Sequence, residues 1–144
     1  MASDTVAISR KQIGGEVPIV ASEITDDCIY TGLFGSLDSA RMAAVTDKVT
    51  MLCEATQISN VIIDLANVDA IDSAVSLELM RLGDTLTMVG VTPIYCGIKG
   101  VLARTMISAG VNIEKYEICR DLKTALHSTL KKMGYKLIKI VDDD

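Results

Sequence analysis

The sequence has few aromatic residues, no clustered basic residues and no long apolar run. Only 3% of its 144 residues are Phe, Trp or Tyr, and Trp is absent, which removes the stacking surfaces that single-strand nucleic-acid-binding proteins and carbohydrate clefts use. The net charge is −5, so a phosphate backbone is not an expected partner. No stretch reaches the roughly 18 apolar residues of a membrane span, and no signal-peptide core is present. We therefore expect a cytoplasmic protein that binds neither nucleic acid nor membrane.

Groups that perform catalysis or bind metals are also scarce. The single histidine, His127, falls within the last predicted helix, away from the strand-end loops. Motifs for nucleotide binding and for nucleophile elbows are absent, and Gly-Ile-Lys-Gly at 97–100 is interpreted as a strand-to-helix turn. Asp64, Asp69 and Asp72 follow one strand without a nearby His or Cys, and we interpret them as solvated loop charge rather than a metal site. The sequence thus predicts a non-enzymatic protein without metal or cofactor.

The four cysteines are far apart, and each lies in an apolar run. They form no C-x-x-C pair, so the sequence predicts neither a zinc site nor a disulfide framework. We expect all four to be reduced and buried in the core. They are Cys28, Cys53, Cys96 and Cys119.

Hydrophobic periodicity predicts alternating strands and helices within residues 17–133. Apolar runs bounded by turn residues predict strands at 17–22, 28–34, 60–68, 92–98 and 116–119. Apolar residues three and four apart predict helices at 39–56, 73–89, 99–109 and 122–133, the first capped by Asp38 or Ser39. This order implies an α/β fold: a single domain with a mostly parallel, mixed sheet of about five strands and about four helices packed on it. Its strand-to-helix loops share one edge, where binding surfaces collect.

The two ends of the chain lie outside this predicted domain. Residues 1–16 are polar and contain two glycines, and we expect a mobile lead-in. Residues 134–144 form a tail with an acidic end. The apolar residues of the tail are Leu137, Ile138, Ile140 and Val141. An added strand and a docking tail both remain open interpretations.

Ser73, at the start of the second predicted helix, is the residue with the most specific local chemistry. A serine N-cap accepts a hydrogen bond from a first-turn N–H, a contribution of about 1 kcal/mol, and this alone explains its presence. The same helix start also offers free N–H groups and the positive dipole end to a phosphate. Asp72 either orients the serine hydroxyl, meets a cation on a partner, or is itself the cap. The residues alone leave these alternatives open.

The segment VIIDLANVDAIDSAVSLELMRLGDTL (61–86) resembles the STAS family of anti-sigma-factor antagonists. It combines a buried strand, an Asp-ending loop, a serine at a helix start and an apolar helix. Single-serine antagonists usually have Asp-Ser-Ser-Gly-Leu here, and Ala74-Val75 in place of Ser-Gly is more similar to the stressosome scaffold subgroup. A second segment, CGIKGVLARTMISAGVNI (96–113), is similar to the helix on which larger scaffold members carry a second phosphorylated position. The resemblance covers about residues 17–133.

The resemblance implies a signalling function. It implies a stressosome scaffold that, with a homologous STAS sensor subunit, sequesters a serine/threonine kinase of the switch-protein type and releases it when Ser73 is phosphorylated. Such a chain forms a homo-oligomer or a large hetero-oligomer. Asp69, Asp72 and Ala74 are the expected neighbours of Ser73 in the partner-binding surface, and Thr105 is a second phosphorylation candidate, although the small scaffold member more often lacks an acceptor there. Two alternatives stay open: a soluble antagonist that binds one anti-sigma kinase one-to-one, and an accessory STAS domain that handles a small molecule or lipid.

Overall fold

A computed structural model describes residues 17 and 19–142, so the expected lead-in at 1–16 lies outside the described residues. The elements follow the predicted order ββαβαβαβα, with one further 3-10 helix, η1 (Ile113–Lys115), that periodicity did not indicate. The strands are β1 (Ile19–Thr25), β2 (Cys28–Ser36), β3 (Asn60–Ala70), β4 (Thr92–Cys96) and β5 (Glu117–Cys119). The helices are α2 (Ser39–Thr56), α3 (Ser73–Met88), α4 (Gly100–Ser108) and α5 (Leu122–Lys132).

The five strands form one mixed sheet in the order β1-β2-β3-β4-β5. β1 runs antiparallel to β2, and all other neighbours are parallel. The apolar run Val61-Ile62-Ile63 of β3 is fully buried, because helices cover both faces of the sheet at this central strand, as predicted. Parallel pairing brings the ends of β2 and β3 together, where Ser36 lies opposite Ala70. This carboxyl edge of the sheet carries the starts of α2 and α3.

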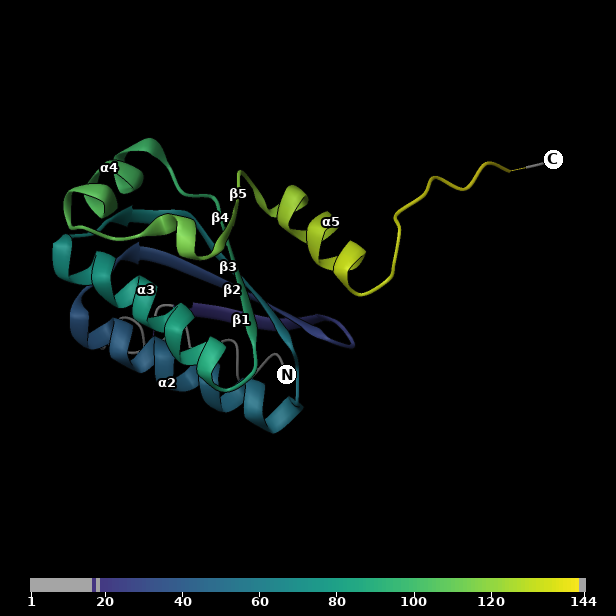
Figure 1. The fold of residues 1–144 in the computed structure, drawn as a ribbon, viewed down its shortest axis with the longest axis horizontal. Helices are drawn as coiled ribbons and strands as arrows, with labels where there is room; N and C mark the ends of the chain where they lie inside the picture. The colour runs from purple at the N-terminus through teal and green to yellow at the C-terminus, as the bar shows by residue number, and fades with distance from the viewer. Residues whose placement is uncertain (1–16, 18, 143–144) are drawn as a thin grey trace.

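The helices cover the two faces of the sheet unequally (Figure 1). α2 and α3 lie side by side on one face, and α4 joins the same large core through Leu102 and Met106. α5 packs on the opposite face, in a smaller cluster that includes Ala125. Two residues of the apolar helix spacing, Val89 and Leu122, are 44% and 38% exposed. Each lies at the end of its helix, outside the packed turns.

The burial of the cysteines and the turn between β4 and α4 agree with the predictions from the sequence. All four cysteines are buried and unpaired. Burial raises the pKa of the Cys28 and Cys53 thiols to about 11, which keeps them protonated near neutral pH. Gly97 begins the turn between β4 and α4 with φ +73°, and a Cβ there would lie 2.8 Å from Ala66 N. Only glycine fits this position without strain, so the turn explains the glycine without a phosphate site.

The segment after α5 has no regular structure. Gly134 (φ +87°) follows the last turn of α5, and residues 135–142 are exposed and form neither helix nor strand. The segment projects away from the body of the domain (Figure 1). Of the two interpretations of the tail, a strand added to its own sheet is therefore excluded in this structure. Each helix in the described part of the chain is too short or too polar to cross a membrane.

Candidate functional site

The carboxyl edge of the sheet carries two Asp-Ser junctions, each at the start of a helix. At α3, Asp72 is the N-cap, and its Oδ1 accepts a hydrogen bond from the Val75 N–H at 2.8 Å. At α2, Asp38 is the N-cap and accepts from the Arg41 N–H, also at 2.8 Å. The capping alternative for Asp72 is therefore confirmed. The interpretation of Ser73 as the cap is wrong, because the aspartate one residue earlier satisfies the first turn.

Ser73 is free to react because Asp72 caps the helix. It is the first residue of α3, it is exposed, and its Oγ makes no hydrogen bond to any group that the structure describes. Ser76, one turn further on, is fully buried and donates its hydroxyl proton to the Asp72 carbonyl oxygen at 3.0 Å. Of these two serines, only Ser73 can enter the active site of another protein while α3 stays folded.

The two Asp-Ser junctions differ in charge. The Arg41 Nε lies 3.6 Å from Asp38 Oδ2 and partly neutralises the junction at α2. Asp72 has no ion-pair partner among the described residues, and neither has the exposed Asp69 three positions earlier. A phosphate adds about −1.5 to −2 charges at neutral pH. On Ser73 this charge would join two uncompensated carboxylates, whereas at the α2 junction it would face a guanidinium.

The predicted site residues at 69–74 lie together, but the three aspartates do not form a cluster. Asp69, at the end of β3, Asp72 and the adjacent Ser73 and Ala74 are all exposed at the carboxyl edge. Asp64 is buried within β3, where it accepts hydrogen bonds from Tyr30 Oη at 2.8 Å and from a backbone N–H. Its interpretation as solvated loop charge is therefore wrong. Within the described residues, no group of three His, Cys, Asp or Glu side chains could hold a metal ion.

Thr105 lies on a separate helix and has a different environment. It is partly exposed on α4, and its hydroxyl donates to the Val101 carbonyl oxygen at 3.1 Å. No hydrogen bond or ion pair among the described residues connects it to residues 69–74. The Thr105 hydroxyl is therefore bonded to its own helix backbone, unlike the hydroxyl of Ser73.

Two cations on α4 are candidate contact residues that sequence reasoning missed. Lys99 is the N-cap residue of α4, is exposed and makes no side-chain capping bond. Arg104 is also exposed, and its Nη1 would lie 3.5 Å from a Cβ placed on Gly100, so its guanidinium covers the first turn of α4. Neither cation has an ion-pair partner in the described part of the chain. The predicted parallel sheet could have indicated these two cations, because parallel pairing of β3 and β4 brings the start of α4 to the same sheet edge as Ser73.

Comparison with known proteins agrees with the resemblance seen in the sequence. Residues 19–129 match the family model of the STAS domain. The RsbT co-antagonist protein RsbRD of Bacillus subtilis (strain 168) is 24% identical over 118 residues, which is 82% of this chain. The chain spans 42% of the length of that relative.

Solved structures share the same fold. A serine-to-glutamate variant of RsbS from Moorella thermoacetica superimposes with a TM-score of 0.66 at 19% identity, over 82% of this chain and 97% of that one. A chain from the stressosome, described as a signal integration and transduction hub, gives a TM-score of 0.63 at 16% identity, over 80% of this chain and 98% of that one. In the described part of the chain, the five-stranded mixed sheet and its four α-helices therefore form a single STAS-type domain.

Proposed function

Because the chain belongs to the STAS family, we propose that it is a scaffold of a stressosome-type assembly that holds a serine/threonine kinase and releases it upon phosphorylation of Ser73. Its neighbours in the assembly are homologous STAS subunits, and the protein itself is not an enzyme. The sequence relationship to an RsbT co-antagonist supports this role. The kinase is of the switch-protein type, and the assembly is cytoplasmic.

The observation that carries the proposal is the exposed, unbonded hydroxyl of Ser73 at a helix start that is already capped. The Asp72 bond to the Val75 N–H fixes the first turn of α3, so the kinase meets a serine in one defined backbone conformation. The neighbours of the serine are exposed and either small or negatively charged, namely Asp69, Asp72 and Ala74. A kinase surface with complementary positive charge would be held there.

Phosphorylation changes the charge of this surface without a need to unfold it. The N–H groups of Ser73 and Ala74 have no partner within α3 because they belong to its first turn, and the positive end of the helix dipole favours an anion. The phosphate is therefore tolerated by the helix. Its charge, added to Asp69 and Asp72, increases the cost of desolvating the surface when the kinase docks. Release follows from the weakened docking.

The first experiment measures kinase retention by Ser73 variants. We expect Ser73→Ala to retain the kinase and to block release by ATP, and Ser73→Asp to weaken retention. Ser39→Ala is the matched control, since Ser39 is also an exposed first helix residue behind a capping aspartate. If the wild type and both Ser73 variants hold the kinase equally, this junction is not the switch.

Mass spectrometry after incubation with the kinase and ATP tests the site itself. The proposal requires phosphate on Ser73. Phosphate on Ser39 or Thr105 alone would contradict the assignment. A homologous STAS subunit mixed with the chain should give a particle of megadalton scale by electron microscopy, and a complex of one chain with one kinase would instead identify a soluble antagonist.

A further inference from the structure

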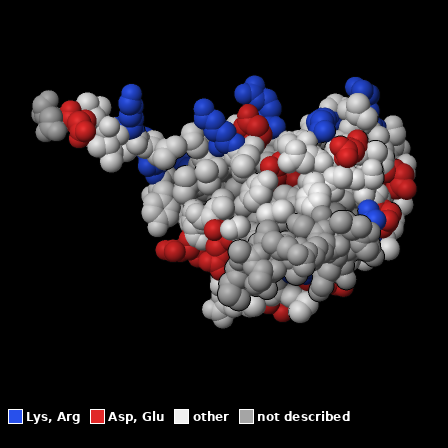
Figure 2. Space-filling model, turned by 180° about the vertical axis from the view of Figure 1, so that it is seen from behind, with Lys and Arg blue, Asp and Glu red and all other residues white. Residues whose placement is uncertain are grey.

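The described part of the tail after α5, residues 135–142, is largely apolar and forms neither helix nor strand. Four of its side chains, Leu137, Ile138, Ile140 and Val141, are 67%, 67%, 85% and 75% exposed. In the view from behind, the tail stands clear of the body and carries basic side chains and, near its outer end, an acidic one (Figure 2). Apolar side chains exposed in this way favour an environment that removes them from water.

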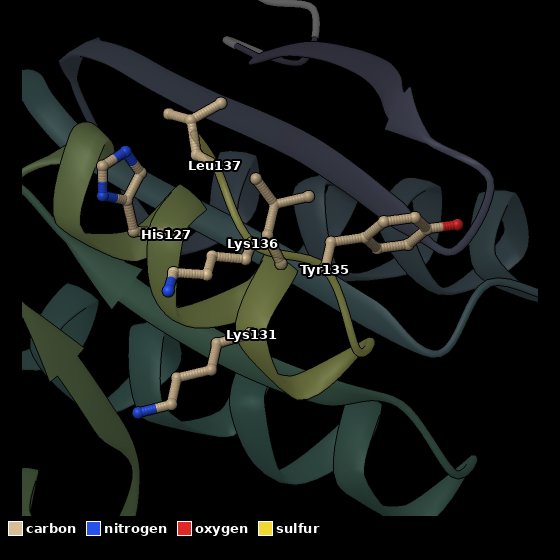
Figure 3. A pocket seen from close by; sticks show the side chains of 6 residues that line it. His127, Lys131, Tyr135, Lys136 and Leu137 are labelled. Atoms are coloured by element: carbon tan, nitrogen blue, oxygen red, sulfur yellow. The ribbon is translucent and has the colours of Figure 1, made fainter. Parts of the chain in front are cut away.

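The tail does not pack on the helix from which it emerges. The Tyr135 N–H donates to the Leu130 carbonyl oxygen at 2.8 Å, and beyond this bond a hollow of about 440 Å³ lies between α5 and the tail, lined by Leu130, Tyr135 and Leu137 together with His127 and two lysines. Figure 3 shows Leu137 on the same side as His127, whereas the Tyr135 ring points away from it. The helix of the same chain therefore leaves the apolar residues of the tail uncovered.

The outer strand of the sheet offers a surface that matches the tail. β1 is the first strand in the sheet order, and no described strand pairs with its outer edge. Within the described residues this edge is therefore unpaired, and an unpaired edge presents N–H and C=O groups to an extended segment. Val20 is 50% exposed on this strand. The register shift between Glu23 and Thr25 leaves five regular residues, 19–23, which match in length the five residues 137–141.

Position and charge also favour this pairing. The tail starts beside the β1–β2 turn, because the Thr25 hydroxyl lies 3.7 Å from the Met133 sulfur at the end of α5. The tail carries Lys136 and Lys139 and, at its outer end, Asp142, whereas β1 carries Glu23 and the turn carries Asp26 and Asp27. Since the tail already points away from its own sheet, a second molecule is the partner that it reaches in this conformation.

We propose that the tail pairs, as an added strand, with the β1 edge of a second copy of this chain, so that two copies exchange tails in a twofold dimer. Strand addition to an open edge supplies backbone hydrogen bonds, and alternate side chains supply apolar contacts. When two identical copies exchange tails, the contact between tail and β1 forms twice, as twofold symmetry requires. The dimer contact begins at the amino end of the parallel strands, where Cys28 pairs with Asn60, opposite the Ser73 edge. It does not rest on the proposed kinase switch.

Sedimentation velocity over a wide concentration range tests the exchange. We expect the wild type to dimerise, and Ile138→Lys/Ile140→Lys or Val20→Lys to weaken the dimer by more than about tenfold, since each places an ammonium group in an apolar contact. The matched control is Met51→Lys, because Met51 is 69% exposed on α2 and should leave the dimer intact. Thermal unfolding followed by circular dichroism verifies that every variant folds.

A mixture of the two variants distinguishes exchange from docking within one chain. The Val20→Lys chain has an intact tail, and the Ile138→Lys/Ile140→Lys chain has an intact β1, so the mixture can form one of the two contacts. Partial recovery of the dimer supports the proposal. A wild type that stays monomeric, a dimer unaffected by both variants, an equal loss with Met51→Lys, or loss without recovery in the mixture would each overturn it.

Discussion

Replacement of Asp72 by alanine separates the structural role of this residue from its role beside Ser73. Asp72→Ala removes the carboxylate that accepts from the Val75 N–H at 2.8 Å. Asp38→Ala removes the equivalent bond at the start of α2, also at 2.8 Å, and so provides a matched control. Both changes delete an aspartate N-cap at the same edge of the sheet. Only the first lies next to the proposed phosphoacceptor.

The expected loss of stability is similar for the two variants. Removal of an aspartate N-cap costs about 1 kcal/mol, which lowers the melting temperature of a domain of this size by about 4 °C. The exposed ion pair between Arg41 and Asp38 adds little to the cost of Asp38→Ala. Asp72→Asn retains an acceptor for the Val75 N–H and should therefore keep nearly all of the stability while removing the charge.

The assay combines urea unfolding with the rate of Ser73 phosphorylation and the affinity for the kinase. We expect Asp72→Ala and Asp72→Asn to weaken the affinity for the kinase, and Asp38→Ala to leave this affinity unchanged. An equal effect of Asp38→Ala on kinase binding would show that lost stability, rather than the Asp72 carboxylate, causes the change. Unchanged stability in Asp72→Ala would refute the assignment of Asp72 as the cap.

Three further predictions concern the packing and charge of the domain. Gly83→Ala should lower the free energy of unfolding by about 1–3 kcal/mol, because its Cβ would lie 2.5 Å from Tyr95 Oη. This clash outweighs the better helix propensity of alanine. Adding Tyr95→Phe should restore part of the lost free energy in urea titrations. Leu79→Ala, at a fully buried position in α3, should cost about 3 kcal/mol in the same assay. The Lys115 ammonium, 2.7 Å away, lowers the pKa of Asp84 below 3.8, so this carboxyl adds stability above its unfolded pKa that is lost as the pH falls through its folded pKa. Asp84→Asn should therefore reduce the dependence of unfolding free energy on pH below about pH 5, and an unchanged dependence would contradict this reasoning.

The fold was predictable wherever local signals agree with the tertiary structure. The helix predicted at 39–56 has the same bounds as α2, because its apolar spacing and the Asp38 cap indicate the same start. The run Val61-Ile62-Ile63 identifies a central strand, since only a strand covered on both faces buries consecutive apolar residues. The apolar residues spaced three and four apart in α3 are all buried: Val75, Leu79, Leu82 and Leu86.

The details of the site depended on features that no local pattern contains. β3 continues to Ala70, two residues beyond the predicted end at 68, and the side chain that caps α3 is that of Asp72 rather than Ser73. The pairing of Tyr30 with Asp64 joins residues 34 positions apart, so no local pattern showed that Asp64 is buried rather than solvated. The sequence also left the tail undecided, because apolar residues on both sides of Lys139 can pair as a strand within a chain or between chains.

The order of the two residues in an Asp-Ser junction determines whether modification of the serine affects the helix. If Ser73 were the cap, a phosphate would replace the group that holds the first turn of α3. Because Asp72 accepts from the Val75 N–H instead, Ser73 can gain a charge while that bond remains. The junction at α2 has the same order but faces Arg41, so an added charge there would be partly neutralised. Local charge, rather than backbone geometry, therefore distinguishes the junction suited to a switch.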